Sequence, residues 1–390
     1  MKVNKNKNVC IVCQSDKLTD VIKIEDIPTH CNLLFDSREK AVNIARGDIN
    51  LVFCENCGHF FNTSFDPSAM EYAESYENSL HFSPHFRHYA EELAQGLIER
   101  YDLHGKTIVD IGCGRGDFLK LICRIGSNKG YGFDKSYVAE LNDNEDVKNV
   151  QFIQDFYGER YANLKTDFVL CRHVLEHIEN PGRFLQGIRK TVGQAPVFFE
   201  VPNVHYTVAN LGIWDLIYEH VSYFSSASLV RLFQKSGFEI LDIRETYDGQ
   251  FLTIQARTAP AGPDELKTNG KEFVPLARKF AEAYRGKVRC MIEQVNHIFD
   301  KNGKVVVWGA GSKGVTMLNI LGMMKQIEYI VDVNPRKEGH YVAGTGQRIV
   351  PPLFLEEYKP EAVVVMNRVY ASEIHDMLNE MSISCDFLFA

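Results

Sequence analysis

Residues 106–120, KTIVDIGCGRGDFLK, constrain the fold more than any other stretch of the chain. Residues 108–111 have the apolar character of a buried parallel strand, and the apolar spacing after the turn predicts a helix. Between them, Gly112 and Gly114 let a ligand approach the backbone, and the helix start offers free N–H groups. Asp110 precedes the first glycine, whereas a pyrophosphate-binding turn usually reads Gly-x-Gly-x-x-Gly. This carboxylate favours a cationic ligand with an amino-acid tail over a diphosphate.

Two acidic positions further along the chain continue the pattern. Residues 130–133 predict a second short strand that ends at Asp134, whose carboxylate suits both hydroxyls of a ribose. Asp155 and Phe156 follow a third predicted strand, 150–153. In this order the three elements resemble the cofactor site of class I S-adenosylmethionine-dependent methyltransferases, and the resemblance implies that Asp155 and Phe156 contact adenine. The alternative is a nucleotide-type Rossmann domain that does not bind this cofactor.

Composition limits the size, the partners and the location of the protein. A chain of 390 residues predicts two or three domains, at about 100 to 200 residues each. With a formal charge of -8 and no basic stripe, we expect no nucleic-acid partner. The chain has no run of 18 apolar residues and its start lacks an apolar signal core, so we expect no membrane partner and a cytoplasmic protein.

Four of the ten cysteines form two matched pairs. Cys10 and Cys13 make one Cys-x-x-Cys knuckle, and Cys54 and Cys57 make the other. In a cytosolic protein such pairs are more typical of a metal site than of disulfides, and four thiolates complete the tetrahedral shell of a structural zinc ion. A redox-active pair is the alternative. We expect this zinc to hold the fold and to take no part in the chemistry.

Further residues are expected at the cofactor cleft. Residues 167–177 predict a fourth strand that leaves the sheet for a helix, and open α/β sheets bind ligands at the carboxyl ends of their strands. Arg172 and His173 are therefore candidates to contact the methionine part of the cofactor or the acceptor, whereas Glu176 and His177 are expected only to cap and pack. Upstream, an aromatic-rich helical segment is expected to place Tyr76 over the cleft, against the acceptor. A packed hinge is the alternative for that segment.

Residues 214–224 are the predicted reaction centre. Tyr218, Glu219 and His220 place a phenol, a carboxylate and an imidazole between the fifth strand and the last helix of the core. An imidazole with a carboxylate beside it is the usual make-up of a general base. Adjacent residues need not face one another, so a contact to the substrate is the second interpretation of Glu219. A structural histidine–glutamate pair remains as the alternative.

These features predict four segments. Residues 1–70 are expected to form a zinc-binding domain, and residues 71–260 a methyltransferase core with its aromatic lid. A boundary rich in Ala, Pro and Gly is followed by a bridging amphipathic helix within 261–300. Residues 301–390 are expected to form a Rossmann-like domain that docks the acceptor.

The last segment opens with a second strand, glycine turn and helix, residues 304–314. It matches Gly-x-Gly-x-x-Gly, with Asp332 about twenty residues onward, which alone would indicate NAD(P). A second cofactor would need a second catalytic set, and none is visible near it. We therefore predict that the helix start near Ser312 and Lys313 holds a phosphate of the acceptor, with dinucleotide binding as the alternative.

Together, the cysteine knuckles, the Glu-His-x-x-Tyr-Phe stretch after the fifth strand and the Gly-Ala-Gly-Ser-Lys-Gly turn resemble the three-domain C-methyltransferases of nucleotide-linked deoxysugars. The resemblance implies an α/β protein with a class I methyltransferase core, an N-terminal zinc ribbon and a C-terminal Rossmann-like domain. It implies that a 4-keto sugar nucleotide loses a proton beside its carbonyl and that this carbon takes the methyl group. His220 matches the family's base, and Glu219 its acidic neighbour.

Two departures from the family pattern leave the acceptor open. Ile217 stands where the family commonly has its catalytic tyrosine, unless Tyr218 substitutes from a neighbouring direction, and residues 248–251 replace a Gly-Gly-Ser-type turn. Methyl transfer to an oxygen or nitrogen of a sugar or another small metabolite is therefore an alternative. An NAD(P)-dependent sugar oxidoreductase and a non-catalytic zinc- and nucleotide-binding module are alternatives from other classes.

Overall fold

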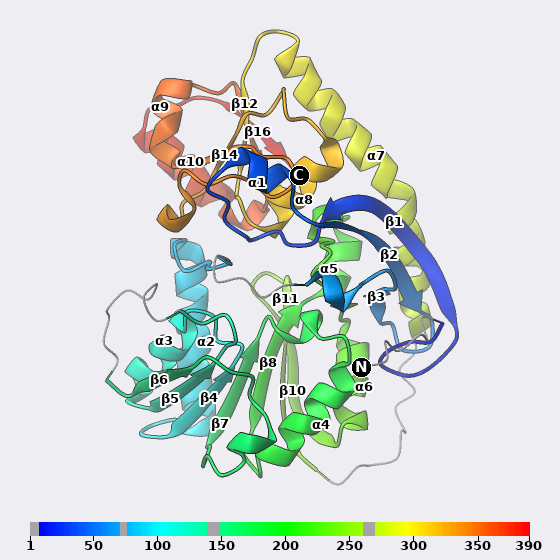
Figure 1. Cartoon of the computed structure of the whole chain (residues 1–390), viewed down its shortest axis with the longest axis vertical. Helices are drawn as coiled ribbons and strands as arrows, with labels where there is room; N and C mark the ends of the chain where they lie inside the picture. The colour runs from blue at the N-terminus through cyan, green and yellow to red at the C-terminus, as the bar shows by residue number, and fades with distance from the viewer. Residues whose placement is uncertain (1–7, 71–75, 139–147, 260–269) are drawn as a thin grey trace.

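A seven-stranded sheet forms the centre of the molecule (Figure 1). The computed structural model describes residues 8–70, 76–138, 148–259 and 270–390. In spatial order the strands are β10 (Phe238–Thr246), β11 (Phe251–Thr258), β8 (Val197–Pro202), β7 (Phe168–Arg172), β4 (Thr107–Ile111), β5 (Lys129–Phe133) and β6 (Val150–Ile153). Strands β8 to β6 are mutually parallel, and β11 runs antiparallel to both of its neighbours. The sheet confirms the expected α/β core.

Helices cover both faces of this sheet, which explains why β4, β7 and β8 are apolar along nearly their whole length. One face packs against α2 (Pro84–Tyr101) and α3 (Asp117–Gly126). The opposite face packs against α4 (Pro181–Thr191) and α6 (Ser226–Lys235). The short helix α5 (Val204–Ala209) follows β8.

A four-stranded antiparallel sheet carries the two cysteine knuckles. Its order is β1 (Leu18–Pro28), β2 (Arg46–Cys54), β3 (Phe60–Asn62) and β9 (Ser222–Tyr223), with the short helix α1 (Arg38–Val42) between β1 and β2. Strand β9 comes from the segment after the core's fifth strand and pairs with β3. The predicted reaction centre is thus attached by hydrogen bonds to the N-terminal sheet.

The C-terminal unit is a five-stranded parallel sheet. In spatial order it contains β14 (Arg348–Val350), β13 (Tyr329–Val331), β12 (Val305–Trp308), β15 (Ala362–Val365) and β16 (Asp386–Phe389). Its helices are α8 (Ser312–Leu321), α9 (Leu355–Tyr358) and α10 (Ala371–Glu380). Figure 1 shows this unit standing above the core sheet.

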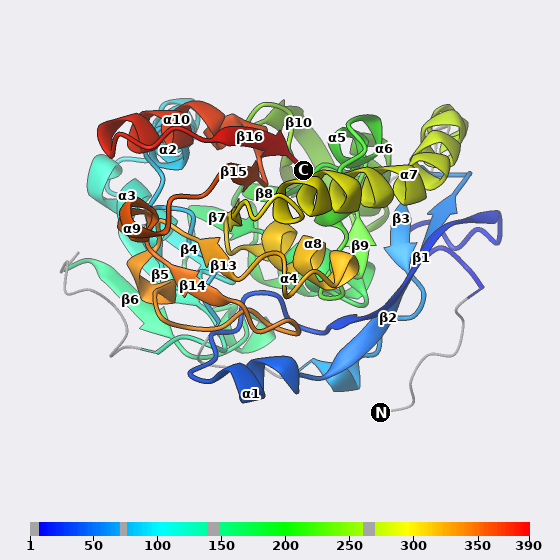
Figure 2. The ribbon, with the colours of Figure 1, turned by 90° about the horizontal axis from the view of Figure 1, so that it is seen from above.

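The long helix α7 (Val274–Phe299) joins the N-terminal and C-terminal units. One continuous hydrophobic core includes Phe53 of β2, Phe280 of α7 and Val305 of β12. Strand β1 contacts both α7 and α8, and Figure 2 shows it passing beside the C-terminal unit. The N-terminal sheet is therefore packed between the core and the C-terminal unit, and it can supply residues to a site between them.

Two local predictions are wrong. The segment before α2 is not helical where it is described: after a 3₁₀ turn at Pro67–Ala69 and the undescribed residues 71–75, the chain runs without helix until α2 begins at Pro84. Proline at the first helical position, with Ser83 as its N-cap, sets that start. Nor does β7 lead directly into a helix: a 3₁₀ turn at Leu175–His177 intervenes, and α4 begins only at Pro181. The division into segments at residues 70, 260 and 300 remains a proposal.

Candidate active site

A cavity of about 700 Å³ lies at the carboxyl ends of β4, β5, β6 and β7. All eight predicted cofactor-binding residues line it, namely Asp110, Gly112, Gly114, Asp134, Asp155, Phe156, Arg172 and His173. Gly112 and Gly114 both have positive φ angles, 70° and 54°. A Cβ at Gly112 would lie 2.2 Å from Val174, whereas one at Gly114 would have no heavy atom within 4 Å. Gly112 is thus required for packing, and Gly114 leaves backbone open to a ligand.

The carboxylates of Asp134 and Asp155 are already engaged by the chain. Asp134 Oδ2 accepts from the Gly114 N–H (2.8 Å), and Oδ1 accepts from the N–H and hydroxyl of Ser136 (2.8 and 2.7 Å). The Tyr161 hydroxyl donates to Asp155 Oδ2 (2.6 Å), and Arg160 pairs with Oδ1 (2.7 Å). Asp134 therefore also orders the glycine turn, and Asp155 is held toward the chain that follows it.

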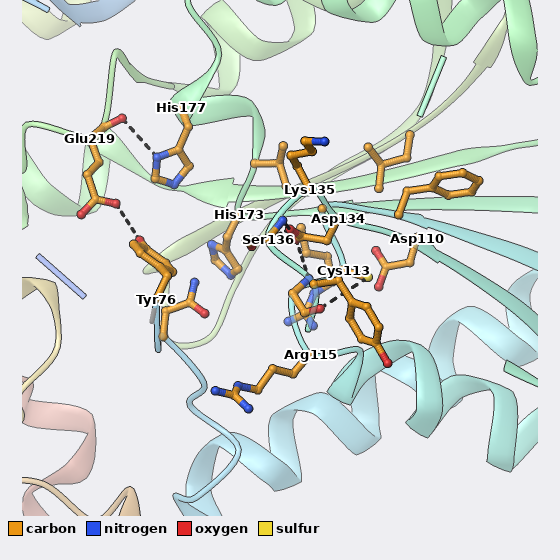
Figure 3. Close-up of a pocket in the computed structure, with 18 of the residues that line it drawn as sticks. Tyr76, Asp110, Cys113, Arg115, Asp134, Lys135, Ser136, His173, His177 and Glu219 are labelled. Atoms are coloured by element: carbon orange, nitrogen blue, oxygen red, sulfur yellow. Dashed lines mark hydrogen bonds between the residues drawn. The ribbon is translucent and has the colours of Figure 1, made fainter. Parts of the chain in front are cut away.

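Arg172 and His173 share one buried carboxylate. Arg172 donates from Nε and Nη2 to Glu200 Oε1 (3.1 and 2.8 Å), and Nε2 of His173 lies 2.9 Å from the same oxygen. Although burial opposes its charge, contacts with Glu176 and Glu200 raise the pKa of His173 to about 9. His173 lies between the glycine turn and the residues predicted for the acceptor (Figure 3). It therefore places a positive charge at the junction of the two parts of the site.

The partly buried Tyr76 and the buried Glu219 form a pair at the other end of this cavity. The Tyr76 hydroxyl donates to Glu219 Oε2 (2.6 Å), as Figure 3 shows, and the Cys31 N–H donates to Oε1 (2.5 Å). Asn32 Nδ2 donates to the Tyr76 hydroxyl (3.2 Å) and to the Ser312 hydroxyl (3.1 Å). Burial raises the pKa of Tyr76 well above its ordinary value, so the phenol stays protonated as a hydrogen-bond donor. The N-terminal unit thus anchors this pair and links it to α8.

His220 faces away from Glu219 and toward His177. The two imidazole rings lie 4.8 Å apart in an edge-to-face arrangement, and His177 Nδ1 donates to the Glu219 carbonyl oxygen (3.1 Å). Burial lowers the pKa of His220 to about 3, so its imidazole is neutral. The carboxylate near these rings belongs to Glu176. The predicted pairing of His220 with Glu219 is therefore wrong, because adjacent residues in this loop point to opposite sides.

Tyr218 lies outside the site. It lines neither cavity, its ring packs against Phe65 at 5.6 Å, and its hydroxyl accepts from the Asp66 N–H (3.0 Å). The structure therefore gives Tyr218 a packing role in place of the predicted catalytic one. Ile217, by contrast, lines a second cavity, which lies beside the first.

A second cavity, of about 340 Å³, lies beside the first. Six residues line both cavities: Tyr76, Asn78, Ser79, Leu80, His173 and His177. His220 lies on the wall of the second cavity, and Ser312 and Lys313 at the start of α8 lie there too. The Lys313 ammonium pairs with Asp215 (2.8 Å). We call this second space the acceptor cavity, because it connects the cofactor side to the C-terminal unit.

The sequence interpretation missed three residues of this site. His177 was expected only to cap and pack, but it lines both cavities. Asn32 lies in a loop with no motif, and Glu176, like His177, was expected only to cap and pack. The Glu-His pair at 176–177 follows a predicted strand, which is the one signal that pointed to the cleft.

The two cysteine knuckles meet in the N-terminal unit. Cys10 Sγ lies 3.6 Å from Cys57 Sγ, and Cys13 Sγ lies 3.5 Å from Cys54 Sγ. All four are buried free thiols, and their sulfur atoms lie within 4.8 Å of one another. Four zinc–sulfur bonds of about 2.3 Å in a tetrahedron place the sulfurs about 3.7 Å apart. The donor set fits a closed structural zinc site, which agrees with the prediction.

The residues present also fit S-adenosylmethionine. Open backbone at Gly114, the carboxylates of Asp110 and Asp134 and the 53% exposed Phe156 line one cavity. An aromatic face suits adenine, carboxylates suit ribose hydroxyls and an ammonium, and a buried carboxylate favours a cation. The donor set therefore matches the parts of that cofactor.

Asp110 makes cofactor affinity depend on pH. Burial raises the pKa of Asp110 to about 7, with Arg172 opposing this shift and Asp134 adding to it. A positively charged cofactor prefers the ionised carboxylate, so below pH 7 a proton must leave on binding. We expect the Kd of S-adenosylmethionine to rise by up to about tenfold per pH unit as the pH falls from 7 to 5. Calorimetry should show this dependence, and Asp110→Asn should flatten it. An equal slope in the variant would contradict the assignment.

Two family models match the chain. The model described as "Methyltransferase domain" matches residues 86–243, and "C-methyltransferase C-terminal domain" matches residues 265–387. "C-methyltransferase NovU" of Streptomyces niveus is 26% identical over 394 residues, covering 94% of this chain and 91% of that protein. "Ubiquinone biosynthesis O-methyltransferase" of Proteus mirabilis is 31% identical, but over 30% of this chain and 47% of its own length.

Solved structures match at low identity. A 1,6-didemethyltoxoflavin-N1-methyltransferase from Burkholderia thailandensis, solved with bound S-adenosylhomocysteine, is 14% identical at a TM-score of 0.35. The match covers 44% of this chain and 78% of that chain.

The fold, the site, the methyltransferase family model and the relative of nearly full length indicate an S-adenosylmethionine-dependent methyltransferase with a class I core. The C-terminal model and the relative of nearly full length agree, so the chain is similar to C-methyltransferases along most of its length. The oxidoreductase and non-catalytic alternatives find no support in these matches. Among the described helices, none is long and apolar enough to cross a bilayer.

Proposed function

We propose that this protein transfers a methyl group from S-adenosylmethionine to the carbon beside the carbonyl of a nucleotide-linked keto sugar. One observation carries the proposal: neutral His220 lies on an acceptor cavity that shares six wall residues with the cofactor cavity and reaches the start of α8. A base, a methyl donor and an anion-binding helix start are thus within reach of one ligand. We further propose a cytoplasmic enzyme with a structural zinc ion.

The residues of the acceptor cavity have distinct proposed roles. His220 Nδ1 is buried without a hydrogen-bond partner among the described residues, so this neutral imidazole can take the proton from the acceptor carbon. Tyr76, fixed by Glu219 and Asn32, offers a protonated phenol at the point where the cavities join. The protonated His173 supplies positive charge near the oxygen of the enolate. Bound S-adenosylmethionine supplies the electrophilic methyl group.

Positioning contributes more than the base in this scheme. Holding two reactants in line lowers the barrier by about 7–11 kcal/mol. A general base contributes a rate factor of about 10²–10⁴, which corresponds to about 3–5 kcal/mol. The shared wall from Tyr76 to Leu80 comes from a segment tied to both units. Glu77 pairs with Arg115 of the glycine turn (3.0 Å), and Asn334 of the C-terminal unit donates a hydrogen bond to the Glu77 carboxylate (3.2 Å). This segment therefore sets the relative position of cofactor and acceptor.

The nucleotide part of the acceptor is proposed to lie against α8. The Ser312 hydroxyl and the Lys313 ammonium line the acceptor cavity at the N-terminus of this ten-residue helix. Lys337, buried beside Asp332 and the Ala310 carbonyl, adds a second ammonium to the same wall. Free N–H groups with nearby cations suit a diphosphate. This arrangement supports acceptor docking by the C-terminal unit.

An O-methyltransferase acting on a sugar or other metabolite is the second candidate. Ile217 lines the acceptor cavity where the family commonly has a tyrosine, and a ubiquinone biosynthesis O-methyltransferase is 31% identical over 30% of the chain. With an oxygen nucleophile, His220 would take the proton of a hydroxyl group, so the acceptor would need no carbonyl group.

A panel of sugar nucleotides tests the proposal. With S-adenosylmethionine, we expect a 4-keto sugar nucleotide to gain one methyl group by mass spectrometry, and its reduced 4-hydroxy counterpart to gain none. With S-adenosylhomocysteine in D₂O, the keto sugar should exchange one carbon-bound hydrogen beside the carbonyl. Methylation of the hydroxy sugar without exchange would reject C-methylation in favour of the O-methyltransferase.

A further inference from the structure

A cluster of metal-type donors lies apart from the four cysteines. Glu176, His177 and His220 each bring one ligand atom within 4.8 Å of the others. All three line the acceptor cavity. Two imidazoles and a carboxylate are a common donor set for divalent transition-metal ions, and three protein ligands leave a coordination position open.

Hydrogen bonds to the backbone hold this cluster together. Glu176 and His177 belong to the 3₁₀ turn Leu175–His177, and the Val221 N–H donates to the Glu176 carbonyl oxygen (2.9 Å). This bond joins the turn to the segment that carries His220. Since His177 Nδ1 donates to the Glu219 carbonyl, the lone pair of a neutral His177 lies on Nε2. Metal-binding histidines are oriented by the same kind of hydrogen bond.

Two buried atoms of the cluster lack partners. Among the described residues, neither Glu176 Oε2 nor His220 Nδ1 has a hydrogen-bond partner, although Glu176 is only 1% exposed. The other carboxylate oxygen, Oε1, lies 3.6 Å from His173 Nδ1. An unpartnered buried carboxylate oxygen costs free energy that a bound cation would recover. The missing partner and the donor set therefore point to the same kind of ligand.

We propose that Glu176, His177 and His220 bind a divalent transition-metal ion with one coordination position open to the acceptor cavity. The site is separate from the four-cysteine zinc site. Metal–ligand bonds of about 2.0–2.2 Å require the three donor atoms to move closer together than they are without an ion. Rotation of the side chains would bring them together. A neutral imidazole has one nitrogen lone pair, so an ion on His220 prevents that residue from taking a proton. Resting on the proposed function, we therefore expect the ion to inhibit turnover.

Titration with Co²⁺ tests this site. The protein is first loaded with zinc at the cysteines and dialysed to remove weakly held metal. We expect one further Co²⁺ per chain, with a spectrum that lacks the sulfur-to-metal charge-transfer band of a thiolate site. Glu176→Gln should weaken this binding by at least tenfold while keeping one zinc and normal S-adenosylhomocysteine binding, which shows that the variant is folded.

Glu245→Gln is the matched control, because Glu245 also lies 3.6 Å from a histidine, His205, but half exposed and outside both cavities. It should bind Co²⁺ like the unaltered protein. No further Co²⁺ in the unaltered protein, or equal binding by Glu176→Gln, would overturn the site. Suppose that Glu176→Gln loses Co²⁺ binding while the unaltered protein, loaded with Co²⁺, keeps full turnover. That result supports the metal site and rejects His220 as the base.

Discussion

Replacing His220 with alanine should reduce methyl transfer by about 10²–10⁴-fold and change the Kd of S-adenosylhomocysteine by less than about twofold. The reason is position: His220 lines the acceptor cavity and not the cofactor cavity. Among the described residues, Nδ1 of its neutral imidazole has no hydrogen-bond partner and can accept a proton. Single-turnover kinetics with saturating cofactor would measure the loss, and calorimetry the affinity.

Hydrogen exchange separates the base from a positioning role. If His220 removes the proton, His220→Ala should also abolish exchange of the carbon-bound hydrogen in D₂O with S-adenosylhomocysteine present. Exchange that continues while methyl transfer stops would show that another group takes the proton. His205→Ala is the control, since His205 is half exposed and lines neither cavity. A near-normal rate in His220→Ala would reject the assignment altogether.

Replacing Cys54 with serine should remove the zinc ion and unfold the N-terminal unit. Structural zinc contributes about 10–16 kcal/mol in small metal-dependent domains, which equals or exceeds the usual 5–15 kcal/mol stability of a whole domain. The four cysteines are buried and pack with Val52 and Phe61 of the N-terminal sheet, so loss of the ion leaves the remaining buried thiols without a shared ligand. Zinc analysis and thermal unfolding would measure the two losses.

The same variant should lose turnover even though the four cysteines lie outside both cavities. The N-terminal unit supplies the Cys31 N–H to Glu219 and the Asn32 amide to Tyr76, and its β3 pairs with β9 beside His220. S-adenosylhomocysteine binding should persist, because its cavity is built mainly by the core. Cys290→Ser, at an exposed cysteine of α7, should leave zinc, stability and turnover unchanged. Full activity in a zinc-free Cys54→Ser protein would contradict this coupling.

Features set by neighbouring residues could be predicted from the sequence. The strand, glycine turn and helix at 106–120 depend on local apolar spacing and on positive φ angles at Gly112 and Gly114, which glycine adopts readily. The two knuckles likewise carry their ligand spacing within four residues each. The expected cofactor residues line one cavity because they follow parallel strands, and the carboxyl ends of parallel strands lie at one edge of a sheet.

Side-chain direction in the loop 217–220 could not be predicted in this way. Glu219 turns toward Cys31 and Tyr76, His220 turns toward His177, and Tyr218 packs under the N-terminal sheet. Irregular backbone has no fixed period, so sequence order does not say which side chain faces which. Pairing of β9 with β3 decides it, and that contact joins residues far apart in the chain.

The sequence by itself determined the three kinds of unit, the glycine turn and the pairing of the two cysteine knuckles, because each depends on a short pattern with a local physical cause. Only the tertiary structure decided which side chains share the acceptor cavity. Glu176 and His177 meet His220 because backbone groups of residues 219 and 221 bond to the turn after β7. Asn32 reaches Ser312 because the N-terminal sheet packs between the core and the C-terminal unit. That packing depends on burial of apolar surface summed over three units, which no local pattern encodes.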